Sequence, residues 1–366
     1  MSTHLIPLLG LDGGNGVGYL AALGTLRLLA HHQPTWKPKL SWNPRTEKAC
    51  LHTAHPVTED ELVKDLHTAL IGGPTDPSAG LAARELLRTR TEQIEVSLKQ
   101  AEKDKSLTKT DLKDRKAAFT SEITELRVRW LEHAAPHLNY GPDTKFKAPE
   151  WRVWELQAQA TAHEQSFHAA TLAALCSSAC VDDEGLAEDT AFRTVRGAGH
   201  QHFLGIMAKQ LLLLTPEHLT KTLLSPWAYD DPTEALSLRW DALDDVRYSL
   251  RWRNPSGDPE RKKQGGMIGA SALAVAGLAF HPVHPRQSGL RTTGFTDIHK
   301  ATTWTWPLWD TPIDIATTRS LIALADSQKD KPDHHQLSPR GVFRLYRCER
   351  FVKDVYYRNF TPATAV

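Results

Sequence analysis

Cysteine is scarce in this chain, and no cysteine motif is present. The 366 residues contain four cysteines and no C-x-x-C pair: Cys50, Cys176, Cys180 and Cys348. A disulfide framework or a zinc knuckle requires cysteines in characteristic spacings. We therefore expect free thiols in a reducing, intracellular compartment.

Long apolar runs and an excess of one charge are also missing. The longest apolar run, 265–280, is rich in Ala and Gly and too short to span a bilayer, and no secretory signal is apparent at the amino terminus. The 44 Lys and Arg residues balance the 43 Asp and Glu residues. The sequence predicts a soluble, cytoplasmic protein with no membrane partner and enough length for a large core.

Catalytic and metal-binding motifs are absent too. His163 and His168 are five positions apart, which places them about 140° apart on a helix, so they do not share a ligand face. Cys176 and Cys180 would share a helix face, but no further ligands accompany them in the sequence. We predict that the protein is not an enzyme and that it has no metal and no cofactor.

The clearest local pattern lies near the amino terminus. A short apolar run, 4–11, leads into a glycine-rich loop and then a segment with helical periodicity, 19–29. The loop glycines are Gly13, Gly14, Gly16 and Gly18. This order is typical of nucleotide-binding motifs, but the spacing is not G-x-G-x-x-G and the next strand does not end in an acidic residue. Three interpretations remain: a nucleotide site, a backbone contact with phosphate, and a tight structural turn.

Composition divides the chain into four segments. Residues 1–80 form an N-terminal α/β part with the glycine loop. In 81–135 apolar residues recur at helical spacing among dense charges, which predicts a helical hairpin, either packed on the body or reaching a partner or a nucleic acid. Residues 136–225 form a helical middle with a helix over 151–180, and 226–366 is mostly β and packs with the N-terminal part. We predict an α+β fold: a mixed sheet from both ends, a helical-hairpin insertion and a helical middle.

Arginine is interleaved with aromatic residues in several predicted strands. Strands are expected at 237–241 and 245–253, the second with Arg247, Arg251 and Arg253 on one face and Trp252 on the other. A basic, glycine-containing stretch before an apolar helix contributes Arg196, Gly197, Gly199, His200 and Gln201. The C-terminal strands add Arg344, Arg347, Arg350 and Arg358. Such strands hold a phosphate chain by charge and bases by stacking; ordinary strands with solvated arginine tips are the alternative.

Six sequence blocks, taken in order, resemble one protein family. They are GYLAALGTLR (18–27), GAGHQHFL (197–204), YSLRWRNP (248–255), TTGF (292–295), WPLW (306–309) and RNFTP (358–362). With these blocks the chain resembles a family encoded in type I-G (formerly I-U) CRISPR loci, in the position of the large subunit beside the helicase-nuclease gene. The resemblance covers both ends and the middle of the chain, but not the charged helical hairpin.

The resemblance implies a non-catalytic part of an RNA-guided, Cascade-like surveillance complex in antiviral defence. Its implied partners are the other effector subunits, guide RNA, double-stranded target DNA and the helicase-nuclease. Such a subunit inspects the flanking motif (PAM), aids R-loop formation and docks the helicase-nuclease, while base pairing reads the target. Two alternatives from other classes remain: a nucleotide-binding enzyme that uses the glycine loop, and a protein–protein scaffold without DNA affinity.

Overall fold

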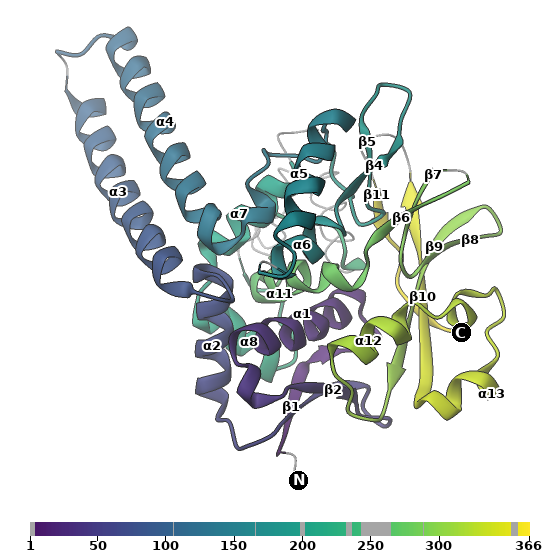
Figure 1. The fold of residues 1–366 in the computed structure, drawn as a ribbon. Coiled ribbons are helices and arrows are strands. Elements are labelled where there is room, and N and C mark those ends of the chain that lie inside the picture. Colours follow the sequence, from purple (N-terminus) through teal and green to yellow (C-terminus); the bar gives the residue numbers. More distant parts are fainter. Residues whose placement is uncertain are drawn as a thin grey trace, which may run out of the picture.

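The fold combines a body of helices and antiparallel sheets with a long helical hairpin that projects from it (Figure 1). The computed structural model describes residues 4–104, 106–164, 166–197, 202–231, 236–242, 265–287, 289–352 and 358–366. The α+β class expected from the sequence is confirmed. In the described part of the chain, no helix has both the length and the apolar character needed to cross a bilayer.

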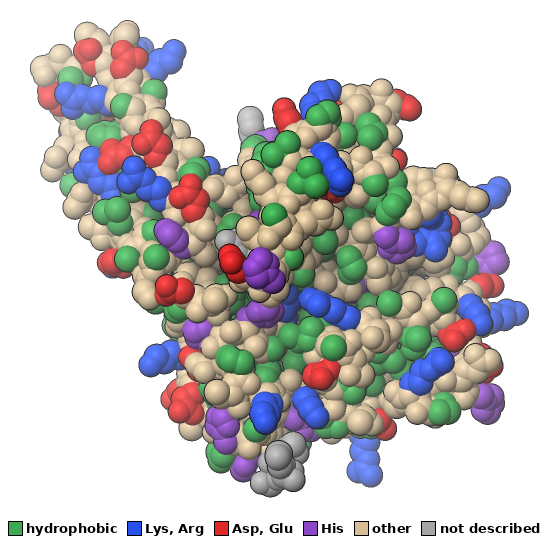
Figure 2. Space-filling view, viewed as in Figure 1, with side chains coloured by type: hydrophobic (Ala, Val, Ile, Leu, Met, Phe, Trp, Pro, Cys, Tyr) green, Lys and Arg blue, Asp and Glu red, His purple; other side chains and the backbone are tan. Residues whose placement is uncertain are grey.

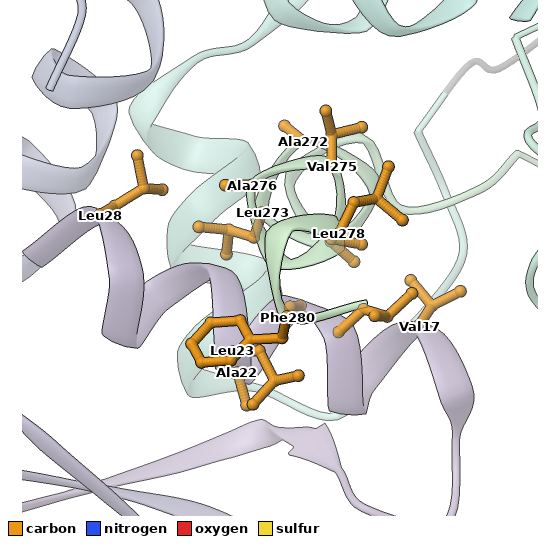
Figure 3. Packing of buried hydrophobic residues seen from close by; sticks show 14 of the residues in the cluster. Val17, Ala22, Leu23, Leu28, Ala272, Leu273, Val275, Ala276, Leu278 and Phe280 are labelled. Carbon is orange, nitrogen blue, oxygen red and sulfur yellow. The ribbon is translucent and has the colours of Figure 1, made fainter. Parts of the chain in front are cut away.

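Two apolar helices at the centre of the body join its N-terminal and C-terminal parts. They are α1 (Gly16–His32) and α11 (Ile268–Gly277). Glycines allow a close approach, because a Cβ on Gly24 would lie 1.8 Å from the carbonyl oxygen of Leu273. Figure 3 shows Ala and Leu side chains of both helices packed together around this contact. Burial of these side chains makes the two ends of the chain share one hydrophobic core.

The strands of the two ends form separate antiparallel sheets, which corrects the expected single mixed sheet. The first sheet contains, in order, β1 (His4–Asp12), β3 (Lys48–Thr53) and β2 (Lys39–Trp42). The second contains β11 (Arg358–Phe360), β10 (Val342–Val352), β9 (Ala301–Trp309) and β8 (Phe295–Ile298), with β12 (Thr364–Ala365) also paired to β10. Short connections such as β2–β3 and β8–β9 favour antiparallel pairing. One isolated bridge, between Leu40 and Ile313, links β2 to the segment that follows β9.

The predicted helical hairpin is confirmed and consists of α3 (Pro77–Lys103) and α4 (Lys109–Ala134). It begins slightly earlier than expected, because Asp76 caps α3 and proline occupies its first position. Its seam is narrow, with Leu87, Ile94 and Ala101 buried. Charges of both signs cover the outside of the hairpin (Figure 2). The base is anchored by Trp130, whose indole donates to the carbonyl of Ile71 at 2.7 Å.

The middle of the chain contains a β-hairpin that the sequence did not predict. The elements here are α5 (Ala148–Ala160), α6 (Ser166–Leu172), β4 (Cys176–Val181), β5 (Ala187–Asp189), α7 (Phe203–Leu213) and α8 (Pro216–Leu224). The expected helix over 151–180 is therefore wrong at its end, where Cys176 and Cys180 lie in a strand. A turn ends that strand: the Asp182 carboxylate accepts from two backbone N–H groups, and Gly185 has φ +76°. All four cysteines are buried and free.

The remaining elements surround this core. They are α2 (Glu59–Gly72), β6 (Val283–Arg286), β7 (Gly289–Thr292), α12 (Ile315–Ile322), α13 (His334–Leu337) and the 3-10 turns η1 (Pro34–Trp36), η2 (Pro136–Leu138), η4 (Leu278–Phe280), η5 (Ala325–Gln328) and η6 (Ser338–Arg340). The expected strand at 237–241 is irregular, and Arg239 there has a positive φ of 55°. The expected strand at 245–253 lies outside the described residues.

Candidate nucleic-acid interface

A cleft of about 590 Å³ lies between the β4–β5 region and the C-terminal strands. Its walls come from β5 and the loop after it, the β6–β7 hairpin, β10 and β11. We call it the arginine cleft, after the arginines that line it: Arg193, Arg196, Arg286, Arg291, Arg350 and Arg358. These residues are far apart in the sequence, so the cleft exists only in the folded chain.

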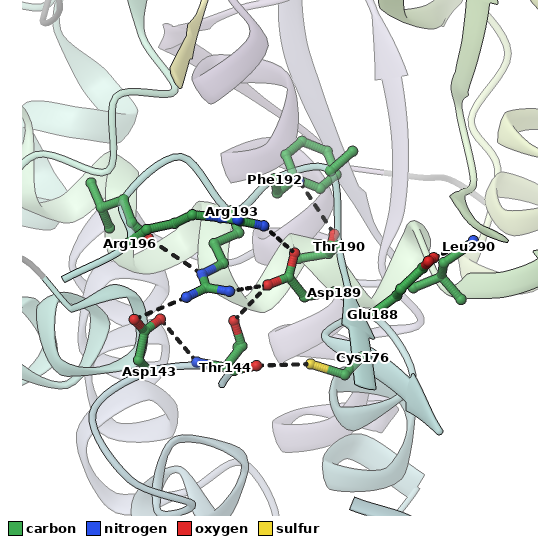
Figure 4. A network of polar contacts seen from close by, with 12 residues as sticks. Asp143, Thr144, Cys176, Glu188, Asp189, Thr190, Phe192, Arg193, Arg196 and Leu290 are labelled. Atoms are coloured by element: carbon green, nitrogen blue, oxygen red, sulfur yellow. Dashed lines mark hydrogen bonds and ion pairs between the residues drawn. The ribbon is translucent and has the colours of Figure 1, made fainter. Parts of the chain in front are cut away.

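Arg193 is the structural centre of the cleft, and it is only 3 % exposed. Its guanidinium forms ion pairs with the carboxylates of Asp189 and Asp143, the latter at 3.0 Å (Figure 4). Burial lowers the pKa of Arg193, but the attraction of the two aspartates outweighs it, and the pKa is raised above its ordinary value. Both carboxylates are therefore committed to holding Arg193 in place.

Arg350 and Arg358 share the cleft face of an antiparallel strand pair. In this pair Arg350 lies opposite Phe360, and Val352 lies opposite Arg358, so the two arginines project to the same side. Burial, and then repulsion by neighbouring arginines, lowers the pKa of each to about 10. Among the described residues, neither guanidinium has a carboxylate at ion-pair distance, and the Nε atom of each lacks a hydrogen-bond partner.

The floor of the cleft therefore has an excess of positive charge. Four arginines (Arg193, Arg196, Arg350 and Arg358) face two aspartates (Asp143 and Asp189) there. The rim is closer to balance, because Asp182, Glu184 and Glu188 also line it and Arg286 pairs with Asp297 at 2.7 Å. Unbalanced, partly desolvated guanidinium groups are stabilised by an anion, and their planar fork matches a phosphate.

Three of the arginines selected from the sequence lie together in the cleft, and two others lie outside it. Arg196, Arg350 and Arg358 line the cleft, and Gly197 follows directly with φ +85°. Arg344 instead pairs with Glu47 at 3.1 Å. Arg347 points to the other side of β10 and donates to the carbonyls of Lys329 and Asp330. The C-terminal arginines thus do not form one continuous track.

Several other selected residues lie outside the described part of the chain. They are Gly199, His200, Gln201, Arg247, Arg251, Trp252 and Arg253. Conversely, the cleft contains residues that were not selected: Lys145, Asp189, Arg286 and Arg291. Asp143, which pairs with Arg193 beside the cleft, was not selected either. No local motif marks these residues, because they lie on separate elements that come together only in the folded chain, where the β6–β7 hairpin packs against β4 and β5.

The glycine loop is closely packed against neighbouring side chains and is held by hydrogen bonds of its own. The Asn15 side chain accepts from the N–H groups of Val17 and Gly18, and the N–H of Gly14 donates to Asp12. A Cβ on Gly16 would lie 2.5 Å from the Trp304 ring. Gly13 is closed in as well, because its carbonyl accepts from the indole of Trp306 at 2.7 Å. This geometry favours the tight structural turn over a phosphate or nucleotide contact.

Among the described residues, no group of three or more His, Cys, Asp or Glu side chains is placed to hold a metal ion.

No family model matches the chain, and no curated protein or solved structure matches it either. The likeness to the type I-G family therefore rests on the six sequence blocks, and the cleft is an independent observation.

Proposed function

We propose that the protein is a non-catalytic subunit of a type I-G CRISPR surveillance complex that binds target DNA beside the flanking motif. The observation that carries this proposal is the excess of arginine over carboxylate at the floor of the arginine cleft. The proposal includes guide RNA, the other effector subunits and the helicase-nuclease as partners, a part in R-loop formation, and a location in the cytoplasm.

Phosphate is the ligand that best fits the cleft chemistry. Arg350 and Arg358 are partly desolvated, and among the described residues neither guanidinium has a carboxylate at ion-pair distance. Guanidinium groups bind phosphate oxygens in pairs, and contacts of this kind release the counterions condensed on DNA. Two such groups on adjacent strands suit successive phosphates of a nucleic-acid backbone.

Recognition of the flanking motif requires base contacts in addition to phosphate contacts. Arg196 lies at the edge of the cleft and pairs only at 3.9 Å with Asp189. An arginine with such a loose partner is able to turn its fork toward guanine in the major groove. Within the proposal, Arg350 and Arg358 position the duplex and the segment that begins at Arg196 reads it.

We propose a non-catalytic role because the buried carboxylates that could act as a general base are engaged in ion pairs. Asp143 and Asp189 are ion-paired with Arg193 and hold it in place, so neither serves as a free general base. The alternative of a nucleotide-binding enzyme receives no support from the glycine loop, where Asp12 and Asn15 take the N–H groups of Gly14, Val17 and Gly18.

One observation favours a second candidate function, that of a protein–protein scaffold. The α3–α4 hairpin projects from the body and buries little beyond its own seam (Figure 1). A projecting helical pair offers two long faces to a partner helix. This function and DNA binding by the cleft are compatible, since they use different parts of the molecule.

Anisotropy of a labelled DNA duplex tests the proposed function. The titration is run with the protein alone and with the assembled guide-RNA complex, using duplexes with a matched and a scrambled flanking motif. The proposal predicts binding that is stronger in the complex and prefers the matched motif. Absence of binding in every mixture would overturn it and leave the scaffold.

A further inference from the structure

A second cavity adjoins the arginine cleft. It measures about 640 Å³ and shares Lys145 and Arg196 with the lining of the cleft. Tyr140, Phe146 and Trp154 form an aromatic wall, and the carboxylates of Asp143 and Glu150 also line the cavity. The cleft and this aromatic cavity form one groove, which is cationic at one end and aromatic at the other.

The aromatic side chains of the cavity are held in fixed positions. The rings of Tyr140 and Trp154 have centroids 4.5 Å apart, and Phe146 meets Trp154 edge-on at 5.1 Å. The Tyr140 hydroxyl lies 2.9 Å from Nε2 of His168, which fixes the phenol ring. Tyr140 and Trp154 are both only half-buried, so part of each ring is available to a ligand.

Two cationic side chains lie where the cavity meets the cleft. Lys145 is exposed, and the Arg196 side chain is 27 % exposed and only loosely paired with Asp189, at 3.9 Å. The nearby Asp143 is engaged mainly by Arg193, at 3.0 Å, and lies 3.9 Å from His202. Solvent-accessible cations therefore stand directly beside an aromatic surface.

We propose that the aromatic cavity binds an unstacked nucleobase of a single-stranded nucleic acid, with the adjacent phosphate against Arg196 and Lys145. This inference rests on the proposed function and specifies a further ligand for the same groove. Stacking on aromatic side chains beside a cationic track is how proteins bind single strands, and it tolerates any base. A paired base remains inside the duplex stack and does not reach such a cavity.

Anisotropy with short labelled strands tests the inference. The probes are a DNA strand, an RNA strand of the same sequence, and an abasic DNA strand that keeps the phosphates. We expect the affinity of the abasic strand to be at least about 5-fold lower than that of the intact strand. The salt dependence of the two affinities should be the same, because both strands keep their phosphates. Base-dependent binding of the DNA or of the RNA identifies the ligand strand. Equal binding of the intact and abasic strands, with RNA no tighter, would overturn the inference without any need for a variant.

Variants of α5 assign the effect to the cavity. Trp154→Ala is expected to lower affinity for the intact strand about 5- to 150-fold, and Trp154→Phe to restore most of it. Val153→Ala is the matched control, because Val153 is exposed on the same helix and does not line the cavity. Unchanged affinity of a folded Trp154→Ala protein for the intact strand would contradict the assignment.

Binding of a duplex separates this inference from the proposed function. Trp154→Ala should bind duplex DNA as the wild type does, since the phosphate contacts of Arg350 and Arg358 remain. If the wild type binds no duplex, the proposed function itself fails. If duplex binding persists while single strands bind without regard to their bases, only the nucleobase inference fails.

Discussion

The guanidinium of Arg350 donates a hydrogen bond to the main-chain carbonyl of Arg193 at 2.9 Å, although the two residues are 157 positions apart. This contact joins β10 to the loop after β5. It places Arg350, which has no carboxylate at ion-pair distance among the described residues, beside the ion-paired Arg193, and so contributes to the positive floor of the cleft. The site is therefore a product of tertiary structure.

The first prediction concerns the glycine loop. Gly16→Ala should destabilise the protein by about 1–3 kcal/mol, because the added methyl group overlaps the Trp304 ring at 2.5 Å. The measurement is urea unfolding followed by circular dichroism.

Gly205→Ala is the control for that variant, since its added Cβ would meet nothing closer than 3.5 Å. It should be neutral or stabilise the protein by up to about 1 kcal/mol through helix propensity. A Gly16→Ala protein as stable as the wild type would show that the loop has room for a ligand.

The second prediction concerns the dependence of stability on pH. His281 is buried, its Nδ1 lies 2.9 Å from the carbonyl oxygen of Thr293, and burial lowers its pKa to about 4. The unfolded chain has a histidine pKa near 6.5, so it binds a proton that the native protein rejects as the pH falls from about 6.5 to 4. His281 thus contributes to the free energy of unfolding above pH 6.5, and this contribution is lost as the pH falls. By pH 5 the loss amounts to about 2 kcal/mol.

His281→Gln should reduce the difference in unfolding free energy between pH 7.5 and pH 5 by that amount. The exposed His163→Gln serves as the control. His168 and His31 are also neutral in the folded protein, because burial lowers the pKa of each to about 4, so part of the pH dependence persists. An unchanged pH dependence in His281→Gln would contradict the assignment.

The third prediction concerns the helical hairpin. Replacing residues 95–117 by a short Gly-Ser linker removes its outer half but keeps the base, including buried Leu87 and Trp130. We expect the free energy of unfolding to change by less than about 1 kcal/mol, because surface ion pairs such as Lys116–Glu102 contribute little. DNA affinity should also be unchanged, which titration of a labelled duplex measures.

Loss of assembly with the other subunits, with DNA affinity intact, would assign the hairpin to the scaffold function. A fall in DNA affinity as large as that expected from replacing both Arg350 and Arg358 by alanine would contradict the placement of the DNA interface in the arginine cleft.

The sequence predicts the local features of this fold better than its site. Helical periodicity correctly identifies the α3–α4 hairpin, and the periodic segment at 19–29 correctly identifies α1. The helix expected over 151–180 fails because the turn chemistry of Asp182 and Gly185 connects the two strands of a β-hairpin that apolar periodicity does not reveal.

Site residues are harder to predict because charge balance depends on long-range pairing. Arg344, Arg347 and Arg350 follow one another along β10 and look equivalent in the sequence. Glu47, from the β2–β3 turn, neutralises the first, and main-chain carbonyls near Lys329 hold the second. Only Arg350 remains beside unbalanced positive charge, and no sequence pattern distinguishes it.

The salt dependence of duplex DNA binding tests the central claim most directly. The account predicts that Arg350→Ala combined with Arg358→Ala weakens binding and lowers the slope of log K against log salt by about 2, which corresponds to two lost phosphate contacts. Arg344→Ala, on the same strand but outside the cleft, should leave the slope unchanged. A correctly folded double variant with the affinity and slope of the wild type would contradict the assignment of the arginine cleft as the DNA interface.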